Sequence, residues 1–183
     1  MTESTSSTFT SSSYTSPVPV PALDAVAPEV HRGIYGMPMY LSIPTPDLAA
    51  SRDFWIRGLG FVDLFSIPGR LTHLRRWAFQ DVLLVPGERA EQPPAISLGV
   101  SCVLSQIAET AARCEELVPG CTSGPREMPW NSVELTVTTP ENARIVMTAA
   151  RPLDPNSPQA QALREVGFDV PAASPSGASP SGA

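Results

Sequence analysis

Four charged or titratable residues lie on predicted strands and could carry chemistry. Glu134 can meet a ligand cation or act as a base, and His73 can act as a general base near neutral pH. Arg75 and Arg144 can each bind a carboxylate or phosphate through two parallel hydrogen bonds. Structural roles are equally open, because Glu134 could pair with either arginine and His73 could face solvent. No Ser-His-Asp set, glycine loop for phosphate or zinc-ligand spacing accompanies them.

A second group of residues offers surface for binding a small molecule. Trp77 and Trp130 can stack on a planar ring, which adds ~1 kcal/mol beyond the burial of area. Each tryptophan is also compatible with an ordinary core or interface position. Further candidates, which supply hydroxyl groups or aromatic rings, are Tyr40, Ser42, Phe79 and Ser97.

The elements that must position these residues occur twice, over about residues 36–88 and 94–151. In the first copy a strand runs into a helix that Asp47 caps, and three strands follow. Trp55 belongs to the apolar stripe of that helix and is predicted to lie in the core. In the second copy Ser105 is predicted to cap the helix. The sequence therefore predicts an α+β domain of two βαβββ modules, in which curled mixed sheets surround a groove and the helices cover the outer face.

Strand alternation predicts which face each side chain occupies. One face is aliphatic in three strands and is expected under the helices; it carries Leu41, Ile43, Ile96, Leu98, Val100, Ile145 and Met147. The other face is small, polar or aromatic and suits a ligand. If Gln80 and Asp81 form a two-residue turn, Phe79 pairs with Val82. His73, Arg75 and Trp77 then lie on the ligand face.

Composition separates this domain, residues 34–151, from its tails. Residues 1–33 are rich in Ser, Thr and Pro and are predicted to be disordered, because they bury too little to offset their ordering entropy. Residues 152–183 form a C-terminal extension, with a short helix capped at Asn156 or Ser157 and then a disordered end.

The net charge and the cysteines further limit the possible functions and the expected location. The net charge of −6 and the pI near 4.8 disfavour nucleic acid and anionic membranes as partners. The three cysteines lack metal-ligand spacing and are expected to be reduced thiols. The sequence shows no apolar run of membrane-spanning length and no secretory signal, so a cytoplasmic location is expected.

Two segments make this sequence resemble the vicinal oxygen chelate superfamily, which includes glyoxalases, dioxygenases and fosfomycin and bleomycin resistance proteins. DLAASRDFWIRGLGF resembles the helix of the bleomycin resistance proteins, and SGPREMPWNSVELTVTTPENARIVM resembles their final hairpin. The resemblance covers residues 36–151 and implies the two-module fold.

The metal enzymes of this superfamily carry His or Glu on the first and last strands of each half. Carried onto this sequence, those positions are Tyr40, Leu84, Ala95 and Val146. The last three have no metal-binding group, and one tyrosine is a poor site for a divalent ion. We therefore expect no metal and no cofactor, and a vacated cleft with Leu84 and Val146 among its lining residues.

The resemblance implies a non-catalytic, metal-independent protein that binds an antibiotic-like natural product, in drug sequestration or self-resistance. The expected partners are an aromatic and cationic small molecule and a second copy of the chain. One alternative is an enzyme of the same fold, a lyase or isomerase of secondary metabolism with Glu134 or His73 as base. The other is a non-catalytic accessory dimer whose tails recruit a partner.

Overall fold

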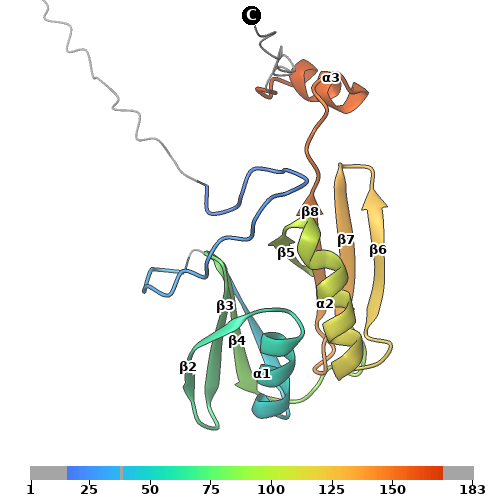
Figure 1. Ribbon diagram of the computed structural model, residues 1–183. Coiled ribbons are helices and arrows are strands. Elements are labelled where there is room, and N and C mark those ends of the chain that lie inside the picture. Colours follow the sequence, from blue (N-terminus) through green and yellow to red (C-terminus); the bar gives the residue numbers. More distant parts are fainter. Residues whose placement is uncertain (1–15, 38, 171–183) are drawn as a thin grey trace, which may run out of the picture.

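The computed structural model describes residues 16–37 and 39–170. The first module contains β1 (Tyr40–Thr45), α1 (Leu48–Arg57), β2 (Val62–Ile67), β3 (Leu71–Arg76) and β4 (Gln80–Pro86). The second contains β5 (Leu98–Cys102), α2 (Leu104–Leu117), β6 (Thr122–Met128), β7 (Ser132–Thr138) and β8 (Arg144–Ala150), and α3 (Pro158–Glu165) follows. The predicted α+β architecture of two βαβββ modules is confirmed (Figure 1). The disorder expected at both ends falls largely on residues 1–15 and 171–183, outside this description.

The two modules form separate four-stranded mixed sheets with equivalent topology. The strand orders are β1-β4-β3-β2 and β5-β8-β7-β6. In each sheet the first strand of the module runs parallel to the last and the remaining pairs are antiparallel. Consequently β1 and β5 are edge strands within the described part of the chain.

Each helix covers one face of its own sheet. α1 packs on β2, β3 and β4, and α2 packs on β6, β7 and β8. The Asp47 side chain accepts hydrogen bonds from Ala49 N and Ala50 N at 3.0 Å, as the sequence predicts. Ser105 does not cap α2: the helix begins at Leu104, after Val103, so Ser105 lies inside its first turn. The Gln106 side chain accepts a hydrogen bond from Val103 N at 3.4 Å, so a glutamine inside the first turn binds the backbone N–H of the residue before the helix.

One apolar core lies under both helices and joins the modules. The predicted aliphatic faces are confirmed at Ile43, Val100, Ile145 and Met147, which are buried, and at Leu41 and Leu98, which pack against them. The prediction is wrong at Ile96, which precedes β5 and is 80% exposed. α1 and α2 contact each other, and Trp55 of α1 is fully buried in the same cluster as residues of the second sheet. The sheets therefore turn their helix-covered faces toward a common interior.

The predicted hairpin between β3 and β4 is wrong in its register. The chain turns at residues 77–79, and Leu74, not Phe79, lies opposite Val82. Trp77 and Phe79 adopt left-handed backbone conformations, with φ of 55° and 63°. Since non-glycine residues seldom adopt positive φ, the residue types at these positions do not predict this turn. The shift of five positions (79 minus 74) is odd, so it moves the side chains of β4 to opposite faces from those predicted.

The segment before the domain lies along its surface, and an extended connection after the domain leads to α3 (Figure 1). Residues 16–37 have no helix or strand. They run past β5 and β8 toward the first sheet, as the blue segment in Figure 1 shows. α3 begins after Ser157, whose hydroxyl accepts from Ala160 N at 3.1 Å. None of the helices over residues 16–37 and 39–170 is long and apolar enough to cross a membrane.

All three cysteines are unpaired and buried. Burial raises the pKa of the Cys102 thiol to about 11 and that of Cys114 to about 12. Burial also raises the pKa of Cys121, and the nearby Glu115 carboxylate adds to that rise. The thiols are therefore protonated at neutral pH and poorly placed for nucleophilic chemistry.

Candidate ligand-binding site

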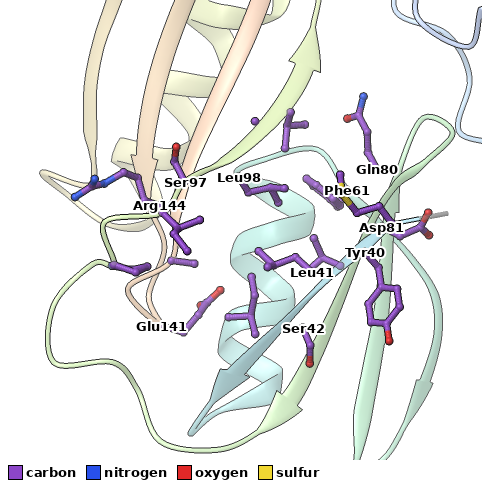
Figure 2. A pocket seen from close by; sticks show the side chains of 18 of the residues that line it. Tyr40, Leu41, Ser42, Phe61, Gln80, Asp81, Ser97, Leu98, Glu141 and Arg144 are labelled. Carbon is purple, nitrogen blue, oxygen red and sulfur yellow. The ribbon is translucent and has the colours of Figure 1, made fainter. Parts of the chain in front are cut away.

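A cavity of about 570 Å³ lies where the edge strands β1 and β5 approach each other. Its wall comes from β1, β4, β5, the segment before β5 and the turn between β7 and β8 (Figure 2). Most of that wall is apolar; its apolar members include Leu41, Ile43, Phe61, Phe79, Val82, Ile96, Leu98 and Val100. The volume lies within the range usual for small-molecule sites in proteins.

The polar side chains of this wall differ in where they point. Figure 2 shows Leu41, Leu98 and Glu141 directed toward the middle of the cavity. The charged ends of Asp81 and Arg144 point away from it, although both residues contribute to the wall. An occupant would therefore meet an apolar interior with a single carboxylate among these labelled side chains.

Asp81 is the centre of a buried polar network beside the cavity. Its Oδ1 lies 2.7 Å from His73 Nε2 and accepts from Arg75 Nε at 2.8 Å. Its Oδ2 accepts from the Tyr35 hydroxyl at 2.7 Å. The side chains of Asp81 and Arg75 are 0% and 1% exposed, so this ion pair is out of water. The register explains the grouping, because Arg75 on β3 and Tyr40 on β1 both lie opposite Asp81 on β4.

Residues 31–35 cover this network from outside the sheet. Arg75 Nη1 donates to the carbonyls of His31 and Gly33 at 2.9 Å, and its guanidinium lies 3.9 Å from the centre of the Tyr35 ring. The Tyr35 hydroxyl also accepts from Phe79 N at 2.7 Å. This short segment is thus fixed by charge-assisted hydrogen bonds and a cation–π contact.

The Tyr35 contact predicts a pH dependence of stability. Burial, and then the hydrogen bond to Asp81, raise the pKa of Tyr35 above its usual 10.0. Because the pKa of Tyr35 is higher in the folded protein than in the unfolded chain, its contribution to stability is complete below the unfolded pKa. That contribution is lost as pH rises through the folded pKa. We expect Tyr35→Phe to lose about 1 kcal/mol at pH 8. This gap should narrow above pH ~10, where the phenol ionises in the unfolded chain while it is still protonated in the folded protein.

Urea unfolding of both proteins from pH 8 upward measures this gap. The comparison cancels the titration of other groups, which both proteins share. A gap that stays constant through alkaline pH would contradict the assignment of Tyr35 as the donor to Asp81.

Glu141 occupies the turn between β7 and β8 and reaches across to α1. It is 3% exposed, and its two carboxylate oxygens accept from Trp55 Nε1 at 2.5 Å and from the Ser51 hydroxyl at 3.0 Å. Ser51 in turn lies 2.7 Å from the hydroxyl of Thr45. The second module is thereby linked to the helix of the first at the wall of the cavity.

The cavity brings together five of the residues proposed from sequence, namely Tyr40, Ser42, Phe79, Ser97 and Arg144. His73 and Arg75 lie next to it, bound to Asp81.

The other five lie elsewhere in the described chain. Trp77 is buried in the hairpin turn, with the Arg76 guanidinium 4.7 Å from its ring centre. Leu84 lies in the core, and Val146 is half-buried on β8. Trp130 is 63% exposed and donates to Glu134 at 2.7 Å, so these two residues pair with each other near the hairpin between β6 and β7.

The positions expected to mark a vacated metal site do not converge. Tyr40 lines the cavity, whereas Leu84 faces the core, Ala95 precedes β5 and Val146 is outside the cavity wall. The prediction that these four positions surround one cleft is wrong, because the odd register shift turns Leu84 inward and β5 begins only at Leu98.

The residues that are present do not suit a metal ion either. Asp81, which the register places beside Tyr40, already accepts hydrogen bonds from Arg75 and Tyr35 and contacts His73. Over the described ranges no group of three or more His, Cys, Asp or Glu residues is placed to hold a metal. The Arg75 guanidinium supplies the positive charge at this carboxylate.

Sequence reasoning missed Asp81, Glu141 and Tyr35. Asp81 was assigned to a turn, which concealed its position opposite Arg75 on a strand. Glu141 lies in a turn, where alternation carries no information about direction. Tyr35 precedes the first strand, and its contacts depend on the path of an irregular segment.

No family model matches the sequence, and no curated protein sequence matches it. Solved structures do share the fold. The fosfomycin resistance protein FosX from Mesorhizobium loti is similar with a TM-score of 0.51 and 14% identity, over 64% of this chain and 94% of that one. The FosX protein from Listeria monocytogenes, complexed with Mn(II) and sulfate, is similar with a TM-score of 0.51 and 12% identity, over 64% of this chain and 92% of that one. The bleomycin resistance determinant of transposon Tn5 has a TM-score of 0.45 and 17% identity, over 61% of this chain and 96% of that one. At identities this low, the two FosX structures show a shared fold and nothing further.

Proposed function

We propose that this chain, whose fold is that of the vicinal oxygen chelate superfamily, is a metal-independent binding protein for a small antibiotic-like natural product. It holds the compound without altering it, as a sequestering or self-resistance protein does. The observation that carries this proposal is the largely apolar cavity of about 570 Å³ between β1 and β5. A preformed apolar cavity with few polar groups is the usual form of a small-molecule site.

The chemistry of the wall supports an apolar or aromatic ligand. Phe61 and Phe79 offer ring surface, and the aliphatic side chains of β1 and β5 supply the remainder. The net charge of −6 favours the approach of a cationic compound. Trp77 and Trp130 take no part in this site, since neither belongs to the cavity wall.

We further propose that the protein acts as a homodimer. On the sheet face away from α1, Phe65 is 50% exposed and Ile67 is 44% exposed. Apolar side chains at this level of exposure on a sheet face suit an interface.

The alternatives gain no support from the geometry. Glu134 accepts from Trp130 and Ser132 and is not part of the cavity wall, and His73 is engaged by Asp81. Neither residue is placed as a base that faces a bound substrate. Nothing about the described segments points to a partner protein for the tails.

Filling the cavity tests the proposal. Gly99 of β5 lines the cavity and a Cβ atom added there meets no atom within 4 Å, so Gly99→Phe adds a ring at the cavity wall from an unobstructed Cβ position. Isothermal titration with a bleomycin-type glycopeptide and a panel of intercalating antibiotics should show binding to the wild type. We expect the affinity to fall by about tenfold or more in the Gly99→Phe variant.

Gly36→Phe is the matched control, because a Cβ there also meets nothing within 4 Å and Gly36 is outside the cavity wall. It should bind like the wild type. Mass spectrometry of the recovered compound should show it unchanged. Equal binding by both phenylalanine variants would contradict the site, and recovery of a modified compound would contradict the non-catalytic role.

A further inference from the structure

Glu141 combines deep burial with an incomplete set of partners. Its carboxylate is 3% exposed and accepts two hydrogen bonds, both from neutral donors, Trp55 Nε1 and the Ser51 hydroxyl. A carboxylate can accept about four hydrogen bonds, so further acceptor capacity remains. No Arg or His of the described segments forms a salt bridge with it.

The arginines that could neutralise Glu141 are engaged or directed elsewhere. Arg89 donates to the side chain of the neighbouring Asn142 at 2.7 Å. The guanidinium of Arg144 points away from the middle of the cavity, whereas Glu141 points into it (Figure 2). Asp81, the other acidic residue of the wall, is already paired with Arg75.

An ionised carboxylate in an apolar site is costly unless a positive charge compensates it. A ligand cation would provide that compensation from within the cavity. Because the surrounding wall is aliphatic and aromatic, the remainder of such a ligand must be apolar. An amphiphilic amine therefore suits this cavity better than a neutral molecule or an anion of the same shape.

We propose that Glu141 is the residue that selects the ligand, by binding an ammonium or comparable cationic group on an apolar body. This inference rests on the proposed function, since it assumes that the cavity holds a small molecule. It places the charge recognition at Glu141, in the turn between β7 and β8, and not at Glu134.

Two probes of nearly equal shape test it. Naphthylethylammonium carries the cation and naphthylethanol replaces it with a hydroxyl group. Fluorescence titration of the wild-type protein should show the ammonium probe binding about tenfold to a hundredfold more tightly, as expected for a charge-assisted hydrogen bond. In Glu141→Gln, whose side chain can still accept from Trp55 and donate to Ser51, the two affinities should become about equal.

Glu134→Gln is the matched control. It removes one negative charge from the net charge of −6, as Glu141→Gln does, but Glu134 lies outside the cavity wall. It should keep the wild-type preference for the ammonium probe. If both probes bind the wild type equally, the cation site is wrong while the cavity remains a binding site. If Glu134→Gln abolishes the preference and Glu141→Gln does not, the selecting residue is misassigned. If neither probe binds, the proposed function fails as well.

Discussion

Replacing Asp81 with alanine is expected to lower the free energy of unfolding by about 3–5 kcal/mol, because it leaves a guanidinium buried without a counter-charge. Arg75 is 1% exposed and pairs with Asp81 at 2.8 Å. The same substitution removes the acceptor of Tyr35 and the partner of His73. Urea unfolding, followed by circular dichroism, measures the loss.

A surface carboxylate provides the comparison for this loss. Asp53 pairs with Arg57 on the exposed side of α1, so Asp53→Ala should cost less than about 1 kcal/mol. The double variant Asp81→Leu with Arg75→Met should recover much of the lost stability, because it removes both charges together. A loss of similar size in Asp81→Ala and Asp53→Ala would show that the network is exposed to water.

Trp55→Ala should be comparably damaging, with a loss of about 3–5 kcal/mol from the cavity that it leaves in the core. The Trp55 side chain is 0% exposed, packs edge-on against Phe61 at 4.9 Å between ring centres, and donates to Glu141. It therefore contributes both to the shared core and to the link between the modules.

Trp55→Phe separates these two contributions. It keeps most of the apolar volume but leaves Glu141 without its indole donor, so the expected loss is about 1–3 kcal/mol. Trp130→Ala is the control, because Trp130 is 63% exposed, and it should change stability by less than about 1 kcal/mol. A large effect at Trp130 with a small one at Trp55 would contradict the described core.

The fold was predictable because its signals are local and periodic. The alternation of Leu41 and Ile43 with Tyr40 and Ser42 identified the face of β1 that belongs to the apolar core. Asp47 marked the start of α1, since a short acidic side chain before an apolar stripe can accept from free backbone N–H groups. Solved structures share the two-module fold that the resemblance implied.

The site was only partly predictable, because it depends on contacts between distant segments. The turn at residues 77–79 uses two aromatic residues with positive φ, against the usual preference, so the sequence assigned Asp81 to the turn and not to β4. The cavity forms where the edges of two sheets approach, which strand alternation does not encode. Glu141 acquires its direction from Trp55 and Ser51, which lie 86 and 90 positions away in the sequence.

The position of a bound ligand is the most direct test of the central claim, that the cavity between β1 and β5 is the binding site. Methyl NMR of the labelled protein can follow Ile43, Val82, Leu98 and Val100, which line the cavity, and Ile67, Leu83 and Val146, which do not. Titration with the tightest antibiotic of the panel should shift the first set of methyl signals and leave the second nearly unchanged. Shifts confined to Ile67, Leu83 and Val146 would place the ligand on the sheet faces away from the helices and contradict the claim.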